Sequence, residues 1–180
     1  MSDTQSPKRI LVLGVGNVLY TDEGIGVRAV EHLEQHYEFS ENVDLMDGGT
    51  LGMKLMGPMM DHDLVIVLDA VLGGDAPGSV YRLTGDDLRG SLAFKNSLHD
   101  TDLVDTLISC GLCGHRPDAV IIGMEPADFQ TMSTDLSGTS DAAMPKFIEA
   151  ALAEVRAAGG THTQRAMPSE EVIYVPRSSC

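Results

Sequence analysis

The chain of 180 residues has the length of one ordinary domain and can bury a core of its own. Its 43% hydrophobic and 22% charged residues exclude a disordered or coiled-coil protein. Twelve Lys and Arg residues against 27 Asp and Glu residues give a net charge of −15, which disfavours nucleic acid as a partner because phosphate backbones would be repelled.

Neither export nor membrane insertion is indicated by the sequence. Residues 1–7 are polar and lack the apolar segment of a signal peptide. The longest apolar runs, at residues 64–68 and 119–122, are far shorter than the roughly 20 residues of a membrane-spanning helix. Three cysteines without a secretion signal are typical of a reducing compartment. We therefore expect a cytoplasmic monomer without a membrane partner.

Segments typical of strands alternate with segments typical of helices along most of the chain. Aliphatic runs predict strands buried on both faces, and a polar–apolar alternation predicts one edge strand. The helical segments carry apolar residues at helical spacing, as at Ile25, Ala29 and Leu33. In chain order, we predict a strand at residues 9–14, a helix at 23–38, a strand at 43–46, a short helix broken near Gly57 and Pro58, a strand at 64–68, an edge strand at 80–84, a helix at 100–109, a strand at 119–123 and a helix at 141–158.

This alternation predicts an α/β fold in which helices cover both faces of a mainly parallel sheet. One domain should span residues 1–160, because Gly159 and Gly160 form a good stop for the last helix. Residues 161–180 form a tail without an assigned role, in which an extended piece is expected at residues 172–175. Ligands bind such sheets beyond the carboxyl ends of the strands, so the loops at that edge are the place to look for chemistry.

A glycine-rich turn follows the first strand but departs from the dinucleotide-binding pattern. Gly14 and Gly16 match the first two glycines of that pattern, whereas Leu19 stands at the third position. The nearest acid at a following strand end is Asp47, well beyond the position about 20 residues on that the pattern requires. A turn without a nucleotide is therefore favoured, and an NAD(P)-dependent oxidoreductase stays open as a rival interpretation.

Two other motifs match metal or redox sites only in part. His32 and His36 share a helix face, but zinc proteases need Glu directly after the first His, so we expect both to be structural. Cys110 and Cys113 form a CxxC at the end of a predicted helix, where the helix dipole disfavours a thiolate. Because no second CxxC completes a zinc site, we expect buried, inert thiols. A serine hydrolase is unsupported, since the chain has no GxSxG.

Three polar side chains remain at one predicted edge of the sheet. Glu23 lies between the first strand and the first helix, Asp69 follows the aliphatic residues 64–68, and His99 precedes the helix at 100–109. Two carboxylates and an imidazole form a donor set suited to Ni, Zn or Mn. Each residue also has a structural interpretation, in which Glu23 stabilises a helix dipole, Asp69 closes a turn and His99 flanks a helix. Asp69 is the most informative, since a carboxylate after an aliphatic strand needs a partner or a cation.

Three sequence blocks resemble a known family. Residues 11–27, LVLGVGNVLYTDEGIGV, are similar to the opening of the [NiFe]-hydrogenase maturation endopeptidases. The sequence DGGT at residues 47–50 resembles the second block of that family, and LDA at residues 68–70 resembles the third. The blocks occur in the order and spacing of the family, and the similarity covers about residues 9–158.

The resemblance implies a three-layer α/β/α fold with a twisted, mainly parallel five-stranded sheet. It also implies an endopeptidase, grouped with aspartyl proteases, that removes a C-terminal peptide from the precursor of the hydrogenase large subunit once nickel has been inserted. The metal-contacting residues of the family fall on Glu23, Asp69 and His99. The Asp of the second block falls on Asp47, which is expected to help recognise the substrate. Nickel would arrive within the precursor, and other divalent cations are expected to occupy the site in vitro.

Two mechanisms and two further kinds of protein stay open at this point. Either the metal polarises the scissile carbonyl, or it is a checkpoint that positions a precursor cut by another group, with Asp47 as the candidate catalytic base. A nickel-binding hydrogenase assembly chaperone would use the same three ligands without cutting. A plain interaction module would bind neither metal nor precursor.

Overall fold

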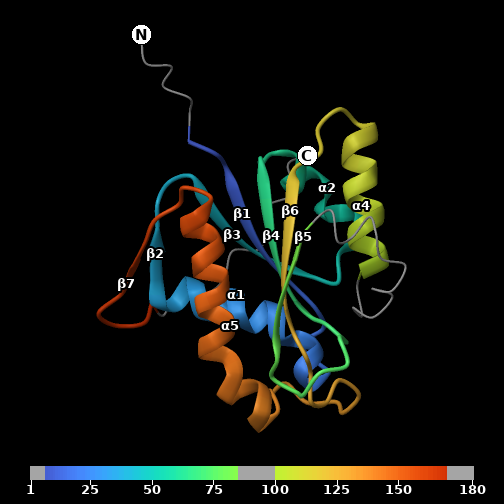
Figure 1. Ribbon diagram of the computed structural model, residues 1–180, viewed down its shortest axis with the longest axis vertical. Helices are drawn as coiled ribbons and strands as arrows, with labels where there is room; N and C mark the ends of the chain where they lie inside the picture. Colours follow the sequence, from blue (N-terminus) through green and yellow to red (C-terminus); the bar gives the residue numbers. More distant parts are fainter. Residues whose placement is uncertain (1–6, 85–99, 170–180) are drawn as a thin grey trace.

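A computed structural model of the chain describes residues 7–84 and 100–169 (Figure 1). Strands and helices alternate over most of these ranges, as the hydrophobic pattern predicts. In chain order they are β1 (Ile10–Val15), the 3₁₀ turn η1 (Thr21–Gly24), α1 (Ile25–His36), β2 (Tyr37–Phe39), β3 (Val43–Gly49), the 3₁₀ turn η2 (Gly52–Leu55), α2 (Met56–Met60), β4 (Leu64–Ala70), β5 (Val80–Thr84), α4 (Asp100–Leu112), β6 (Asp118–Met124), α5 (Gly138–Ala157) and β7 (His162–Gln164).

Five strands form the main sheet, in the order β3-β1-β4-β6-β5. They run parallel except β5, the predicted edge strand, which pairs antiparallel with β6. Every residue of β1 and β4 is buried, which is why both segments are continuous aliphatic runs in the sequence. The predicted α/β/α fold with a mainly parallel five-stranded sheet is therefore confirmed.

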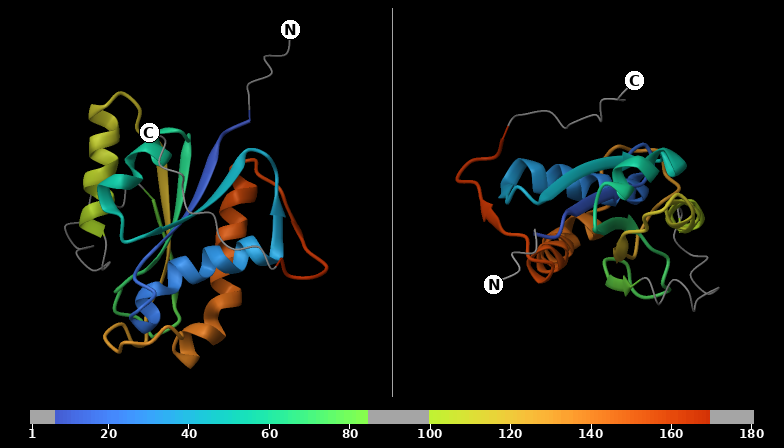
Figure 2. Two further views of the ribbon diagram at one scale, coloured as in Figure 1. Left: turned by 180° about the vertical axis from the view of Figure 1, so that it is seen from behind. Right: turned by 90° about the horizontal axis from the view of Figure 1, so that it is seen from above.

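Helices cover both faces of this sheet (Figures 1 and 2). α1 and α5 pack on one face, where Ile10 and Val12 of β1 point. α2 and α4 pack on the other face, against Leu11 and Leu13 of the same strand. Because successive side chains of a strand point to opposite faces, each central strand contributes to both apolar cores.

Three local features differ from the expectations. The first helix spans Ile25–His36 instead of residues 23–38, because the residues before it form the 3₁₀ turn η1 and the chain continues from Tyr37 as the strand β2. Gly57 and Pro58 lie within α2 and do not break it, since both occupy its first turn, where a backbone N–H has no helical partner and proline is tolerated. Cys110 is buried as expected, whereas Cys113 is exposed.

Part of the predicted tail belongs to a second, smaller sheet. β7 pairs antiparallel with β2, with Tyr37 opposite Gln164, beside the end of α1 (Figure 1). Residues 172–175, for which an extended piece is predicted, lie outside the described residues. No helix within the described ranges has both the length and the apolar character to cross a membrane.

The order of the strands reverses at β1. From β1 the chain passes through α1 on one face to β3, and it then returns through α2 on the other face to β4, on the opposite side of β1. In open α/β sheets, ligands bind at the carboxyl ends of strands where such a reversal occurs. The topology therefore directs attention to the ends of β1 and β4, at the lower edge of the sheet in Figure 1.

Candidate functional site

Glu23 lies just beyond β1, half-buried in the turn η1. The turn folds back so closely over the end of β1 that a β-carbon on Gly16 would lie 1.9 Å from the carbonyl oxygen of Glu23. Gly16 also has a φ of 130°, a conformation that only glycine adopts readily. The second glycine of the turn therefore places Glu23 at the sheet edge.

Two more glycines seat α1 directly on the strand ends. A β-carbon on Gly14 would lie 2.3 Å from the carbonyl oxygen of Gly26, and one on Gly26 would lie 2.0 Å from that of Leu68. The start of α1 therefore contacts both β1 and β4, backbone against backbone. The glycines of the first sequence block bring the turn that carries Glu23 to the end of β4. These backbone contacts explain why glycine stands at these positions, and no bound nucleotide is needed to explain it.

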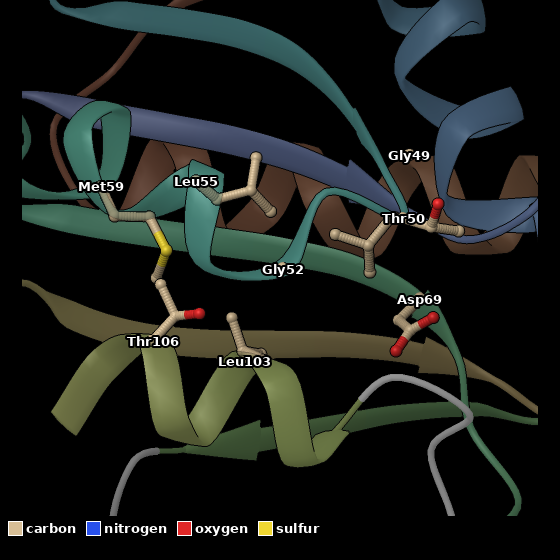
Figure 3. Close-up of a pocket in the computed structure, with 9 residues that line it drawn as sticks. Gly49, Thr50, Gly52, Leu55, Met59, Asp69, Leu103 and Thr106 are labelled. Carbon is tan, nitrogen blue, oxygen red and sulfur yellow. The ribbon is translucent and has the colours of Figure 1, made fainter. Parts of the chain in front are cut away.

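Asp69 lies near the carboxyl end of β4 and is only 2% exposed. Its Oδ1 accepts a hydrogen bond of 2.8 Å from the backbone N–H of Ala70. The side chain lines a narrow cavity, beside Thr50 at one end, while Met59 and Thr106 lie at the other end (Figure 3). Since most of the remaining lining is apolar, Asp69 brings a carboxylate into a mainly apolar space between η2 and α4.

Asp47 lies toward the end of β3 and closes the turn that follows. Its Oδ1 accepts a hydrogen bond of 2.8 Å from the backbone N–H of Gly49, which has a φ of 47°. Burial raises the pKa of Asp47 above its ordinary value, and the Glu31 carboxylate on α1 acts in the same direction. The Gly49 N–H and the Arg28 guanidinium partly oppose this rise in pKa. Asp47 therefore holds a proton more readily than a solvated Asp does.

Asp47 and Asp69 point to opposite faces of the sheet. Asp47 is in register with Gly14, and Gly14 with Leu68, so the two acids stand two strands apart, or about 10 Å. Asp69 shares the face of Val67, which carries α2 and α4, whereas the alternation along β3 turns Asp47 toward α1. A substrate that reaches both acids has to pass over the edge of the sheet.

A buried carboxylate that no motif singles out fixes the loop after Asp69. Glu125 directly follows β6, and its Oε2 accepts hydrogen bonds from the N–H groups of Gly73 at 2.7 Å and Gly74 at 3.1 Å. The hydroxyl of Tyr81 donates a third hydrogen bond, of 2.6 Å. The signal for Glu125 was present in the sequence, because it follows an aliphatic strand just as Asp69 does.

A second carboxylate of this kind is Asp22, the residue before Glu23. It is fully buried, and its hydrogen-bond partners lie 105 to 115 residues further along the chain, between β6 and α5. No local pattern predicts partners at that separation. The structural role of Asp22 therefore could not be predicted from sequence motifs.

The third predicted metal ligand, His99, lies outside the described residues. Within residues 7–84 and 100–169, no group of three or more His, Cys, Asp or Glu side chains is arranged to hold a metal ion. Of the three predicted ligands, Glu23 lies just after β1 and Asp69 lies near the end of β4, and both strands end at the same edge of the sheet. The three-ligand site as a whole stays a prediction.

The other motifs show structural roles. The rings of His32 and His36 stack with centroids 4.0 Å apart, and burial, with a smaller effect of His36, lowers the pKa of His32. Nδ1 of His36 donates to the carbonyl oxygen of His32 over 2.9 Å. Burial raises the pKa of the Cys110 thiol, as expected for an inert cysteine.

Comparison with known proteins identifies the relatives of this chain. A family model described as hydrogenase maturation protease (HycI) matches residues 27–154. The hydrogenase 2 maturation protease of Escherichia coli (strain K12) is 39% identical over 153 residues, which cover 84% of this chain and 93% of that protein. The hydrogenase expression/formation protein HupD of Rhizobium leguminosarum bv. viciae is 39% identical over 159 residues, 87% of this chain and 79% of that protein.

Solved structures agree with this result. The hydrogenase maturating endopeptidase HybD from E. coli has a TM-score of 0.81 and 38% sequence identity, covering 88% of this chain and 98% of that chain. The [NiFe] hydrogenase maturation protease HybD from Thermococcus kodakarensis shares the fold, with a TM-score of 0.68 at 24% identity and a coverage of 79% of this chain and 96% of that chain. The predicted family is therefore confirmed: this chain belongs to the hydrogenase maturation proteases and is a hydrolase that acts on peptide bonds.

Proposed function

We propose that this protease removes a C-terminal peptide from the precursor of a [NiFe]-hydrogenase large subunit after nickel has been inserted. The observation that carries the proposal is the position of Glu23 and Asp69 at the edge where β1 and β4 end, the place where the strand order reverses. Ligands bind at this edge in open α/β sheets. Both acids also match the metal-contacting residues of the family that the sequence blocks resemble.

The donor chemistry at this edge fits a divalent cation that belongs to the substrate. Two carboxylates brought to one edge repel each other, and a cation between them relieves that repulsion. With His99 they would form a nitrogen and oxygen donor set that suits nickel and leaves coordination positions for groups of the precursor. Nickel held there would supply positive charge that polarises a neighbouring peptide carbonyl. A precursor without nickel would lack this attraction.

Asp47 serves a different part of the substrate in this proposal. Because burial raises its pKa, its carboxyl group takes up a proton at a pH closer to neutrality than a solvated Asp does, which suits a general base or acid. It faces α1, about 10 Å from the strand of Asp69. Asp47 would therefore contact the precursor from the α1 side of the sheet edge, apart from the Asp69 carboxylate.

The test is to incubate the protein with nickel-loaded and with nickel-free precursor and to measure the mass of the precursor afterwards. We expect only the nickel-loaded precursor to be shortened. Glu23→Gln and Asp69→Asn should leave it intact while the protein stays folded. The matched control is Asp118→Asn. Asp118 is an exposed acid at the start of β6, at the opposite edge of the sheet, so this variant should cleave the precursor as the wild type does.

Each other outcome of this experiment has a definite meaning. A precursor that binds but keeps its full mass would identify a nickel-binding assembly chaperone. Equal cleavage of the nickel-loaded and nickel-free precursors would refute the nickel dependence. Cleavage by Glu23→Gln at the wild-type rate would remove Glu23 from the site.

A further inference from the structure

Asp22 connects the turn of Glu23 to the loop between β6 and α5. Its buried Oδ2 accepts hydrogen bonds from the backbone N–H groups of Ala127 at 2.9 Å and Asp128 at 3.0 Å. Its Oδ1 accepts one from the backbone N–H of Ser137 at 2.8 Å. The Ser137 hydroxyl donates a fourth, of 2.7 Å, to Oδ2. Four donors offset the cost of burying this carboxylate, which is otherwise several kcal/mol.

Through Ser137, this connection extends to the longest helix. Ser137 is the N-cap residue of α5, and its Oγ accepts a hydrogen bond of 3.2 Å from the backbone N–H of Ser140. The same hydroxyl donates to Asp22, so a single side chain caps α5 and holds the turn η1. Figure 1 shows the start of α1, the loop after β6 and the start of α5 gathered at the lower edge of the sheet.

The turn that Asp22 holds is conformationally strained. Thr21 has a φ of 39° and is the one residue other than glycine with a positive φ in the described ranges. For a β-branched residue such a conformation costs on the order of 1–3 kcal/mol and persists only where the surroundings enforce it. Here the N–H of Thr21 donates to the carbonyl oxygen of Ser133 over 2.9 Å, and its Oγ1 donates to that of Thr131 over 2.7 Å.

We propose that Asp22 is a positioning residue: it holds η1 in this strained conformation so that the Glu23 carboxylate stays where it contacts the nickel of the precursor. Glu23 is the next residue of the same four-residue turn, so a relaxation at Thr21 or Asp22 redirects its side chain. The inference rests on the proposed function, in which Glu23 contacts that metal. It adds a residue that acts through Glu23 and touches neither metal nor peptide.

The variant that tests this role is Asp22→Asn, which keeps the shape of the side chain but changes its hydrogen bonds. If the Asn oxygen takes the place of Oδ2, its NH₂ group faces the N–H of Ser137, donor against donor. We expect the KM for nickel-loaded precursor to rise about 10- to 100-fold, the range found when groups that orient metal ligands are removed. A mere loss of folded protein would lower the apparent kcat and leave KM unchanged.

Two controls separate positioning from stability. Asp135→Asn changes an exposed acid of the loop between β6 and α5 whose side chain has no hydrogen-bond partner among the described residues, so KM should stay at the wild-type value. Leu152→Ala leaves a cavity beneath α5, where Leu152 is buried, and should cost about 2–5 kcal/mol without changing KM.

The outcomes separate this inference from the proposed function. If the wild type cleaves nickel-loaded precursor and Asp22→Asn keeps the wild-type KM, or if Leu152→Ala raises KM equally, the positioning role is wrong. If the wild type does not cleave, the proposed function fails. Amide hydrogen exchange of residues 20–24 then tests whether Asp22 stabilises the conformation of η1. Faster exchange in Asp22→Asn but not in Asp135→Asn would support this role, and unchanged exchange would overturn it.

Discussion

Gly26 and the carbonyl group of Leu68 are in direct backbone contact, so close that a β-carbon on Gly26 would lie 2.0 Å from that oxygen. The contact joins the helix that follows Glu23 to the strand that carries Asp69. Because both partners are backbone groups, neither can rotate away as a side chain would. The relative position of the two acids is therefore set by a glycine that carries no chemistry itself.

Replacing Gly26 should disrupt the fold and the site together. Gly26→Ala forces α1 away from the end of β4, which we expect to destabilise the protein by about 3 kcal/mol or more, in the upper range of overpacked substitutions. Gly57 is the matched control, a glycine in α2 whose β-carbon would meet no atom within 4 Å. Gly57→Ala should be neutral or stabilising by up to about 1 kcal/mol. Urea unfolding measures both, and equal stabilities would contradict the role of the contact.

Asp47→Asn should separate stability from activity. Burial raises the pKa of Asp47 from its ordinary value of 3.8, so the folded state binds its proton more tightly than the unfolded state does. The contribution of Asp47 to the stability of the folded state therefore falls as the pH rises from 3.8 through the raised pKa. Above the raised pKa, the buried charged carboxylate destabilises the folded state. Asn carries no charge and still accepts the Gly49 N–H bond. At neutral pH we expect Asp47→Asn to be at least as stable as the wild type.

The same variant should lose most of its cleavage of nickel-loaded precursor. Its control is Glu41→Gln, an exposed acid between β2 and β3, which should leave both stability and cleavage unchanged. Denaturation at several pH values and the mass of the precursor are the measurements. Full cleavage by Asp47→Asn would leave Asp47 with only its structural role in the turn.

The sheet and the edge that carries the candidate site could be predicted because their signals are local. β1 and β4 are buried along their whole length, so each is an uninterrupted aliphatic run, and the strand at residues 80–84 shows the alternation of an edge. Asp69 is conspicuous because a carboxylate ends such a run. Because the carboxyl ends of parallel strands lie at one edge of a sheet, the position of Glu23 and Asp69 at the same edge could also be predicted.

The details of the site depend on contacts between distant segments. Asp22 is held by Ser137, 115 residues further along, and nothing near Asp22 in the sequence predicts that partner. The strain at Thr21 exists only because the loop after β6 holds the turn. Along β3, apolar side chains point to both faces, with Val43 and Leu45 on one and Met46 on the other. The hydrophobic pattern therefore does not assign Asp47 to a face, and its direction follows from the register between β3 and β1.

Tyr81→Phe should weaken the loop that follows Asp69. Burial and the Glu125 carboxylate both raise the pKa of the Tyr81 hydroxyl, so this group stays a hydrogen-bond donor at all ordinary pH values. Phe keeps the ring against Gly73 but removes a hydrogen bond to a buried carboxylate, which costs about 1.5–3 kcal/mol. Tyr20→Phe, whose hydroxyl has no hydrogen-bond partner within the described ranges, should cost less than about 0.5 kcal/mol. If the Tyr81→Phe protein were as stable as the wild type in urea, the hydrogen bond from Tyr81 to Glu125 would not stabilise this loop.

Two exposed apolar side chains beside the turn of Glu23 should contribute to binding of the precursor. Leu19 is 54% and Met132 is 73% exposed, and they precede the residues of a parallel bridge between Tyr20 and Ser133, which sets them side by side. Exposed apolar groups on a firmly bonded surface next to a site are typical of protein recognition. Leu19→Ser and Met132→Ser should each raise KM roughly fivefold, about 1 kcal/mol of lost apolar contact, with kcat and the melting temperature unchanged.

The controls for this surface are equally exposed apolar residues elsewhere. Leu112, 85% exposed, ends α4 near the opposite edge of the sheet, and Met167, 79% exposed, follows β7 (Figure 1). Leu112→Ser and Met167→Ser should leave KM at the wild-type value, because neither residue borders the ends of β1 and β4. If all four substitutions raise KM alike, the effect is a general loss of surface apolarity. If Leu19→Ser and Met132→Ser change nothing, the precursor approaches Glu23 and Asp69 without crossing this surface.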